Sequence, residues 1–318
     1  MPAQEEFVER AAPYRGELIA HCYRMLGSVH DAEDLVQETY LRGWRGYQAF
    51  EERAALKTWL YRIATTACLR ALENRARRVL PAGLGDGSID PDVDLDAAAG
   101  AHAWLEPIPD AMMFKGPEED VTAKQSVRLA VMTALQELPA RQRAVLILRD
   151  VVQFSAAEVA ELLETTPAAV NSSLQRARAR LAELSPAEER MSEPGDARRR
   201  ELLDRYCAAF ENADMAALTA LLQADVKLEM PPLPVWFAGR DTVLRFLAGR
   251  ALAPPGDIAM IPTAANAQPA VAEYRAAADG VLRAHSIHVI TPGAGGIAGI
   301  TVFLDPGLFT AFGLSPSR

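Results

Sequence analysis

The segment from Gln153 to Leu184 constrains the fold of this chain more than any other. Ser155 followed three residues later by Glu158 is typical of a capping box, which predicts the start of a short helix. Thr166 and Pro167 are the residue types favoured at the N-cap and first turn of a second helix. The sequence therefore predicts two helices joined by a tight turn.

The second of these helices has two faces of different character. Its apolar residues alternate in steps of four and three, which places them on one stripe that packs against the first helix. They are Val170, Leu174, Ala177 and Leu181. The turn and the other face carry amide, hydroxyl and guanidinium groups, which suit base edges and phosphates. These DNA-binding candidates are Thr165, Thr166, Ala168, Asn171, Ser172, Gln175, Arg176 and Arg178.

We interpret the segment as a helix-turn-helix, whose second helix enters the major groove of DNA. The spacing of such motifs is degenerate. A plain helical hairpin with a solvated outer face is therefore the alternative interpretation.

Composition limits the classes of protein that fit this chain. The 318 residues, of which 50% are hydrophobic, allow two or three domains with real cores. A net charge of -9 argues against a protein that coats nucleic acid nonspecifically, so DNA contacts must come from local basic faces. No apolar run approaches a membrane span and the start does not resemble a signal peptide, so we expect a cytoplasmic protein with no membrane partner.

Cysteine usage predicts neither a disulfide framework nor a metal site. Cys22, Cys68 and Cys207 are odd in number, lie far apart and are each set in a helical pattern. Buried reduced thiols are the expectation in such a case. We therefore expect no metal and no cofactor.

Amphipathic helices fill the first part of the chain. The pattern predicts helices between Glu5 and Leu26 with Gly27 as the stop, and a further helix from Ala32 to Trp44 capped by Asp31. This further helix has an acidic outer face, which would repel DNA but suits docking on a basic protein surface. The face consists of Glu33, Asp34, Gln37 and Glu38. A merely solvated helix face is the alternative.

Aromatic and basic side chains alternate along the next predicted helix, which begins at Ala55. Aromatic faces beside cations are what single-stranded nucleic acid requires, because unstacked bases lie on the rings and cations hold phosphates. The candidates are Lys57, Trp59, Tyr61, Arg62, Arg70, Asn74, Arg75, Arg77 and Arg78. For Trp59 and Ile63 a core position is the alternative, since aromatic stripes on helices usually pack inward.

Three sequence motifs precede the helix-turn-helix in a characteristic order. They read DAEDLVQETYLRGW from Asp31, KTWLYRIA from Lys57 and LPARQRAVLILRD from Leu138. Together they resemble the extracytoplasmic-function (group IV) sigma factors of bacterial RNA polymerase. The resemblance implies two all-α sigma domains, core RNA polymerase and promoter DNA as partners, and no catalytic activity of the sigma domains.

The same resemblance implies roles for particular residues. The helix after Asp31 would grip the clamp coiled coil of the largest polymerase subunit. Its contact residues would be Asp31, Asp34, Leu35, Gln37 and Glu38. The helix from Lys57 to Arg78 would recognise and help open the minus-ten element, and the helix from Ala168 to Arg178 would read the minus-thirty-five element. Thr65 and Thr66 stand in the melting helix where many relatives have Asn, so the bases preferred at minus-ten do not carry over.

Prolines, glycines and aspartates mark the boundaries of the predicted domains. Residues 80–120 show no sustained period and read as a linker, with one apolar docking candidate at Trp104-Leu105-Glu106-Pro107. A helical pattern then resumes and predicts a helix from Glu118 to Leu138. We predict a sigma region 2 domain at 1–79, the linker at 80–120, a sigma region 4 domain at 121–185 and a tail domain at 197–318. By resemblance, the linker would run near the polymerase active site.

The pattern changes class in the tail. Helices are predicted at 197–212, 214–222 and 241–250, the second of them capped by Asp214, and strands at 226–230, 258–263, 270–277, 282–291 and 297–303. Helices followed by a meander of strands predict an α+β domain with a curved sheet wrapped round the helices. With YCAAFENAD from Tyr206 and the Met230-Pro-Pro loop, the tail resembles the SnoaL-like, cone-shaped barrel that also hosts ketosteroid isomerases.

A cone-shaped domain of this type encloses an apolar pocket. The polar candidates for facing it are Tyr206, Glu229, Trp236, His285 and His288. His285 and His288 are three apart on a strand and should point to opposite sides, so no cooperating pair is expected. Because a fold alone does not confer activity, packing is the preferred role for these residues.

We therefore expect a sigma factor whose tail regulates it or senses a small-molecule ligand. In this expectation the tail packs on both sigma domains and sets their spacing. The alternatives are a tail with isomerase or hydrolase activity, and a stand-alone helix-turn-helix regulator that binds an operator. The latter would leave the acidic helix and the Trp59 helix without a role.

Overall fold

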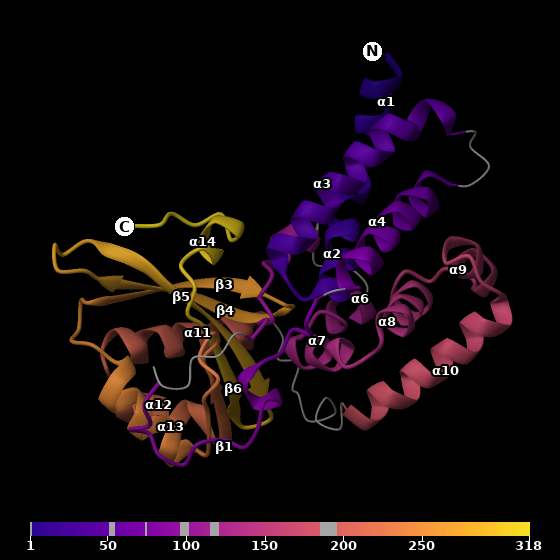
Figure 1. Ribbon diagram of the computed structural model, residues 1–318. Helices are drawn as coiled ribbons and strands as arrows, with labels where there is room; N and C mark the ends of the chain where they lie inside the picture. The colour runs from indigo at the N-terminus through magenta and orange to yellow at the C-terminus, as the bar shows by residue number, and fades with distance from the viewer. Residues whose placement is uncertain (1, 51–54, 74, 96–101, 115–120, 185–195) are drawn as a thin grey trace. The chain divides into compact units, whose positions relative to one another are not determined.

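The computed structural model describes residues 2–50, 55–73, 75–95, 102–114, 121–184 and 196–318. The chain forms two compact units. The helical unit consists of Met1–Arg78 with Asp110–Pro186, and the sheet unit consists of Val79–Pro109 with Ala187–Arg318 (Figure 1).

Helices form nearly all of the helical unit. The α-helices are α1 (Pro2–Ala11), α2 (Arg15–Leu26), α3 (Val29–Gly46), α4 (Leu56–Leu72), α5 (Asp110–Met113), α6 (Val121–Gln125), α7 (Leu129–Gln136), α8 (Ala140–Leu146), α9 (Ala156–Leu162) and α10 (Pro167–Leu184). Short helical turns are η1 (Ala12–Tyr14), η2 (Tyr47–Ala49) and η4 (Ile147–Val151). Helix α2 ends at Gly27, which has the left-handed conformation (φ 71°) that glycine adopts without strain, as predicted.

Three predicted boundaries in this unit are wrong. Ser28, and not Asp31, caps α3, because the Ser28 hydroxyl accepts a hydrogen bond from the Asp31 amide (3.1 Å) and the helix begins a turn earlier. Helix α4 ends at Leu72, well before Arg78. The helix predicted from 118 to 138 is two helices, because Arg128 has an extended backbone (ψ 145°), and residues 118–120 lie outside the described part.

The helix-turn-helix is formed by α9 and α10, as predicted. Both halves of the capping box are present, since the Ser155 hydroxyl accepts from the Glu158 amide and the Glu158 carboxylate accepts from the Ser155 amide. Thr166 accepts from the amide of Ala169 (3.2 Å) at the start of α10. The apolar stripe buries Val170, Leu174 and Ala177.

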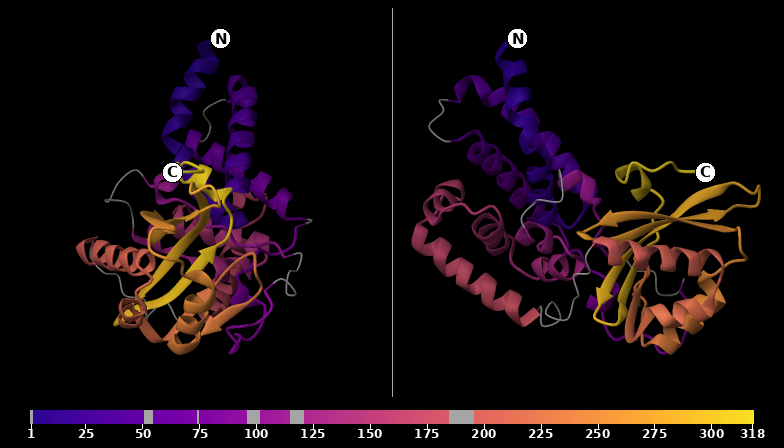
Figure 2. Two further views of the ribbon diagram at one scale, coloured as in Figure 1. Left: turned by 90° about the vertical axis from the view of Figure 1, so that its left-hand side faces the viewer. Right: turned by 180° about the vertical axis from the view of Figure 1, so that it is seen from behind.

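A six-stranded sheet with three helices on one face makes up most of the sheet unit (Figure 1, Figure 2). The strands are β1 (Leu222–Glu229), β2 (Trp236–Ala238), β3 (Ile258–Ala265), β4 (Gln268–Ala276), β5 (Leu282–Gly293) and β6 (Gly296–Phe303). The helices are α11 (Asp196–Glu211), α12 (Met215–Leu221), α13 (Arg240–Phe246) and α14 (Leu308–Ala311), with short turns η3 (Pro81–Gly83) and η6 (Leu247–Ala251).

The strand order is β2-β1-β6-β5-β4-β3, with β1 and β6 parallel and the other neighbours antiparallel. Side chains of α11, α12 and α13 share one buried apolar cluster with the sheet, including Tyr206, Phe210, Phe237 and Ile290. The five predicted strands are confirmed, and the short β2 was not predicted. Asp214 caps α12 as expected, by accepting from the Ala217 amide (2.9 Å).

The described residues between 79 and 109 lie along the sheet unit. Val79 and Trp104 form an isolated parallel bridge, and Ser88 forms another with Phe237 of β2. Leu105 and Ile108 are fully buried. The sequence predicted a linker without helix or strand here. Pro and Gly interrupt the segment, and it has no periodic hydrophobic pattern from which its pairing with the sheet unit could be predicted.

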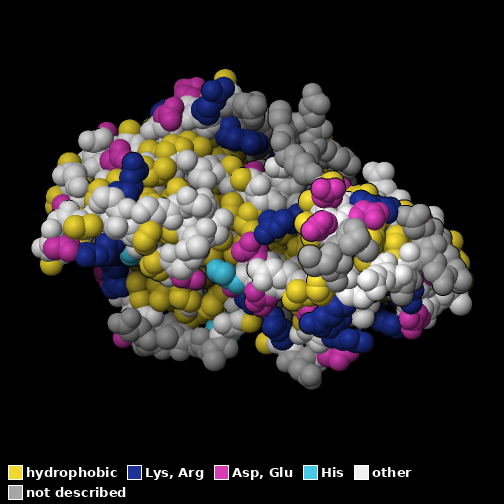
Figure 3. Space-filling view, turned by 90° about the horizontal axis from the view of Figure 1, so that it is seen from above, with side chains coloured by type: hydrophobic (Ala, Val, Ile, Leu, Met, Phe, Trp, Pro, Cys, Tyr) yellow, Lys and Arg dark blue, Asp and Glu magenta, His cyan; other side chains and the backbone are white. Residues whose placement is uncertain are grey.

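The side-chain chemistry of the two units differs at the surface. In Figure 3 charged side chains of both signs gather on the helical unit, whereas the sheet unit shows mainly hydrophobic and uncharged atoms on the same face. Cys22, Cys68 and Cys207 are buried free thiols, as predicted. Within the described ranges, no helix has the length and apolar character that crossing a membrane requires.

Candidate polymerase and promoter interfaces and a buried cavity

The outer face of α3 is partly exposed. Asp34 and Gln37 are exposed, whereas Leu35 is half-buried and Glu38 pairs with Arg42 (2.5 Å). Asp31 is engaged, since its Oδ2 accepts from Arg75 (2.5 Å) and from Arg78 (2.8 Å). Burial raises the pKa of Asp31, but hydrogen bonds and charge attraction from these two arginines outweigh it and leave the pKa below its usual value. Asp34 and Gln37 are therefore the accessible part of this face.

Two of the predicted minus-ten residues on α4 are buried. The Tyr61 side chain packs edge-on against Phe154, with ring centroids 5.3 Å apart. The Thr65 hydroxyl lies 2.9 Å from Nε2 of His21 in the core of the helical unit. Neither side chain is able to contact nucleic acid in this arrangement. The sequence pattern could not reveal this, because the partners come from distant segments.

Most of the basic candidates around α4 pair with carboxylates of the helical unit. Lys57 pairs with Glu17 (2.5 Å), Arg62 with Glu164 (3.2 Å) and Arg77 with Glu137. Thr66 donates to the Arg62 carbonyl (2.8 Å), and Arg70 is exposed. Trp59 is half-buried and stacks on Phe50, with centroids 4.9 Å apart. Asn74 lies outside the described residues.

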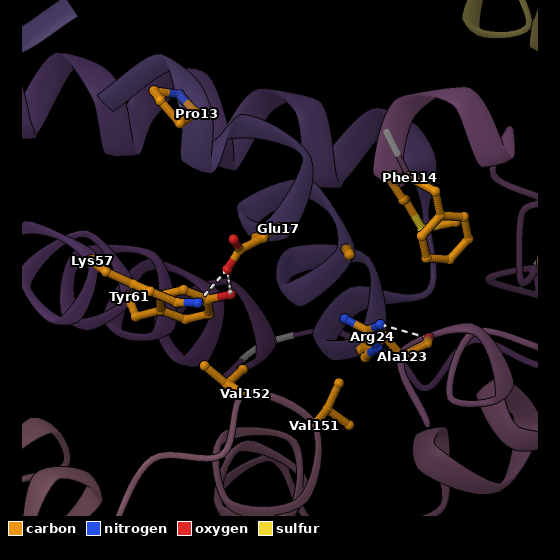
Figure 4. Close-up of a pocket in the computed structure, with 11 residues that line it drawn as sticks. Pro13, Glu17, Arg24, Lys57, Tyr61, Phe114, Ala123, Val151 and Val152 are labelled. Atoms are coloured by element: carbon orange, nitrogen blue, oxygen red, sulfur yellow. Dashed lines mark hydrogen bonds and ion pairs between the residues drawn. The ribbon is translucent and has the colours of Figure 1, made fainter. Parts of the chain in front are cut away.

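A cavity of about 260 Å³ marks the junction of the two predicted sigma domains (Figure 4). Lys57 and the Tyr61 hydroxyl converge on the Glu17 carboxylate from α4, the hydroxyl at 3.4 Å. On the other side, Arg24 donates to the Ala123 carbonyl (2.9 Å). Residues from both segments of the helical unit therefore line one cavity, and α4 and the helix-turn-helix segment belong to one packed body.

Arg143 on α8 connects the same two segments through hydrogen bonds in the interior of the helical unit. Its guanidinium is buried and donates to the Met25 carbonyl at the end of α2. It also donates to Oε1 and the carbonyl of Gln136 (2.8 and 3.0 Å) and to the Leu138 carbonyl (3.1 Å). Burial lowers the pKa of Arg143 to about 10, so the group stays charged at neutral pH.

The recognition face of α10 is exposed. All eight DNA-binding candidates of the turn and helix, from Thr165 to Arg178, are exposed to solvent. Arg176 donates to Ser173 on the same helix (3.3 Å). Arg178 makes a bidentate pair with Asp150 (2.9 and 2.7 Å), so it would have to leave this partner to bind DNA.

A second cavity, of about 240 Å³, lies in the sheet unit between the helices and the sheet. Tyr206, His285 and His288 line it together. The expectation that the two histidines point to opposite sides is wrong. Glu273 pairs with Ser286 and the next β4 residue pairs with Ala284, so His285 is an extra residue on β5, and such a bulge changes the alternation of side chains.

Two of the predicted pocket residues are not among the residues that line this cavity. The Glu229 carboxylate accepts a hydrogen bond from the Ala82 amide (2.8 Å), and Trp236 Nε1 donates to the Gly85 carbonyl (2.9 Å). Burial raises the pKa of Glu229, although the Ala82 amide acts in the opposite direction.

Sequence reasoning missed Glu273 on β4, whose carboxylate lines this cavity. Burial alone would raise its pKa, but hydrogen bonding to His288 and nearby positive charge lower it to about 2. Glu273 Oε2 lies 3.1 Å from Nε2 of His288, and the Tyr206 hydroxyl lies 2.9 Å from Nδ1 of the same ring. Arg275 donates to the other carboxylate oxygen (2.7 Å). Tyr206, His288 and Glu273 therefore form a buried hydrogen-bonded chain.

Known protein families match the chain in three places. Residues 11–78 match Sigma-70 region 2, residues 128–181 match Sigma-70, region 4, and residues 203–303 match the SnoaL-like domain. The chain is 47% identical to the ECF RNA polymerase sigma factor SigG of Mycobacterium tuberculosis, over 99% of this chain and 86% of the relative.

SigJ of the same species, also named an ECF RNA polymerase sigma factor, is 29% identical over 74% of this chain and 70% of the relative. The crystal structure of Mycobacterium tuberculosis SigJ matches with a TM-score of 0.60 at 25% identity, covering 96% of this chain and 98% of the other. The expected fold of helical sigma domains with a SnoaL-like domain is thereby confirmed. The chain belongs to the extracytoplasmic-function RNA polymerase sigma factors.

Proposed function

We propose that the chain binds core RNA polymerase through α3, opens the minus-ten element with α4 and reads the minus-thirty-five element with α10, under the control of its sheet unit. Asp34 and Gln37 on α3 and Asn171 and Arg176 on α10 support these roles, because they are exposed on faces whose other sides are buried. Both proposed partners, polymerase and promoter, place this activity in the cytoplasm.

The packing of α4 against the helix-turn-helix segment carries the proposal of control. Tyr61 packs against Phe154, and Arg62 pairs with Glu164 of the turn. Promoter opening by α4 requires these groups to be free, so the arrangement described is a closed form. A ligand or partner that binds one form better shifts the equilibrium between closed and open forms.

We assign the controlling role to the sheet unit because it includes most of the described residues between the two sigma domains. The described residues of 79–109 are hydrogen-bonded to the sheet unit, and Leu105 and Ile108 are buried there. In this proposal the tail senses a small molecule and is not an enzyme, since the relatives carry the names of sigma factors. The fold itself does not decide between binding and catalysis.

Run-off transcription with core polymerase tests the first part of the proposal. We expect a promoter-specific transcript only when the chain is added, and loss of this transcript with Asp34→Lys, because a reversed charge would meet a basic docking surface. Glu9→Lys, an equal charge change at an exposed position on α1, should leave transcription and polymerase binding unchanged.

Unaltered polymerase affinity of Asp34→Lys would rule out the docking role of α3. Specific DNA retention by the chain without polymerase would support the stand-alone regulator instead. Turnover of a substrate by the sheet unit would support the enzyme alternative.

A further inference from the structure

The cavity of the sheet unit has the size of a binding site for a small molecule. Its volume of about 240 Å³ exceeds the roughly 150 Å³ of an engineered apolar cavity that binds benzene. Most of its wall is apolar, from Phe210 on α11, Leu228 on β1, Phe246 on α13 and Val302 on β6. An apolar wall with a few convergent polar groups is the usual form of a ligand site.

The polar groups of this wall are arranged to offer one hydrogen bond to a ligand. Glu273 is ionised and can only accept, so Nε2 of His288 donates to it. When the ring is neutral, Nδ1 accepts and the Tyr206 hydroxyl donates to it. When the ring takes up a proton, Nδ1 becomes the donor and the Tyr206 hydrogen is free to turn towards the cavity.

The charges around His288 favour an anion as the acceptor. The ionisable groups that line the cavity with it are Tyr206 on α11, Glu273 and Arg275 on β4, His285 on β5 and Arg250 in η6. With the rings neutral, two arginines face one carboxylate, which leaves one positive charge. Burial and the Glu273 charge raise the pKa of Tyr206 well above its usual value, so the group remains a donor.

One residue of the segment between the sigma domains belongs to the cavity wall. Leu95 lines the cavity, and Arg250 holds the backbone just before it by donating to the carbonyls of Asp92 and Val93 (2.9 Å each). A molecule in the cavity would pack against Leu95, and this contact would be lost if the segment left the sheet unit. Binding of the molecule and attachment of the segment to the sheet unit therefore stabilise each other.

We propose that this cavity binds a small, mainly apolar carboxylic acid, whose carboxylate accepts the hydrogen bond of Tyr206. The bound acid holds residues 92–95 on the sheet unit and so stabilises the closed form of the sigma factor. This inference rests on the proposed control by the sheet unit, and it names the ligand class and the contact through which that control acts.

Titration calorimetry on the full chain, without polymerase, tests the site directly. The probes are benzoate, phenylacetate, cyclohexanecarboxylate and 1-naphthoate, with phenylacetamide as a neutral control. We expect saturable binding of at least one acid. Phenylacetamide should bind more weakly, because it has no negative charge to accept the hydrogen bond of Tyr206. Absence of binding by all four acids, or equally tight binding of phenylacetamide, would overturn the proposal.

Variants separate the direct contact of the ligand with Tyr206 from its indirect coupling to the attachment of residues 92–95. Tyr206→Phe should weaken the best acid roughly tenfold, because a charge-assisted hydrogen bond is lost while the ring stays. Arg250→Gln should loosen residues 92–95 and so weaken binding of the acid, whereas Arg245→Gln, at an exposed position on the preceding helix α13, should bind the acid as the wild type does. Undiminished binding by Tyr206→Phe would contradict the site.

Hydrogen exchange and transcription then separate this inference from the proposed function. The best acid should slow amide exchange at residues 92–95 of the full chain, and unchanged exchange there would refute the coupling. Run-off transcription with and without the acid is read independently. A transcript unaffected by an acid that binds and slows exchange would defeat the proposed control and leave the binding site intact.

Discussion

Buried polar side chains stabilise each of the two units through hydrogen bonds within that unit, as Arg143 and Glu273 show. Arg143 sits in a motif that resembles other sigma factors, yet its pattern gives no sign that it is buried and donates to three backbone carbonyls. Glu273 lies in a strand that was predicted, but a period of two does not reveal a partner on β5. Caps are different, because Ser155 and Asp214 meet partners three residues away in the sequence, so both were predictable.

Glu273 should make the stability of the sheet unit depend on pH in acid. Its pKa falls from 4.5 in the unfolded chain to about 2 in the folded one, and the side chain is almost fully buried. A group with a lowered folded pKa stabilises the protein above its unfolded pKa, and this contribution is lost as pH falls through the folded pKa. A difference of this size corresponds to on the order of 3 kcal/mol.

We therefore expect the stability difference between wild type and Glu273→Gln to be largest above pH 4.5 and to shrink as pH falls towards 2. Urea unfolding at a series of pH values measures this difference. A gap that stays constant over the range would show that Glu273 is not held ionised by His288 and Arg275.

At the scale of elements, local signals decided what could be predicted. The helix-turn-helix, the caps and five strands were predicted because their patterns are complete within the segment. The end of α4, the break before α7 and the bulge at His285 were not, because each depends on partners distant in the sequence. Arg75 and Arg78, for example, turn back to Asp31 instead of continuing the helix.

Helix α10 allows a direct test of base reading. Arg176→Ala should weaken binding of the polymerase holoenzyme to its preferred promoter by about 1 to 3 kcal/mol and relax selectivity at one base pair, because a base contact by arginine is lost. Arg180→Ala is the matched control, since Arg180 lies one turn further on and pairs with Glu183 (3.0 Å). Competition binding against single-base promoter variants measures both. An equal loss on every promoter would show that Arg176 contacts only phosphate.

At the scale of the whole molecule, the order of segments along the sequence does not match the division of the chain into two compact units. The sequence predicted a linker at 80–120 between two sigma domains, whereas the described residues of 79–109 belong to the same compact unit as the tail. The contacts responsible are mainly hydrogen bonds from the backbone of the segment to side chains of the sheet unit, together with a few apolar side chains, and these leave no periodic pattern. The resemblance to sigma factors gave the family and the fold class correctly but could not give this attachment.

Two of the contacts that hold the segment act as separate anchors, and each should be removable without the other. At the first, Trp236 Nε1 donates to the Gly85 carbonyl (2.9 Å) and the indole ring packs over Gly87. At the second, Asn266 Oδ1 accepts from the Ile108 amide (3.1 Å), and the Asn266 backbone has a positive φ of 56°. Because the two anchors use different parts of the sheet, Trp236 on β2 and Asn266 between β3 and β4, loss of one should leave the other intact.

Hydrogen exchange on the full chain measures this independence. Trp236→Ala should speed exchange around Ser88 roughly tenfold and leave Ile108 protected, since about 1 kcal/mol of hydrogen bonding and the ring contact are lost. Asn266→Gly should do the reverse, and glycine is the suitable replacement because it accepts the positive φ without strain. Faster exchange at both sites in either variant would mean that the segment detaches as one cooperative piece. Attachment would then be all-or-none, and a single ligand contact at Leu95 would control the whole of residues 79–109.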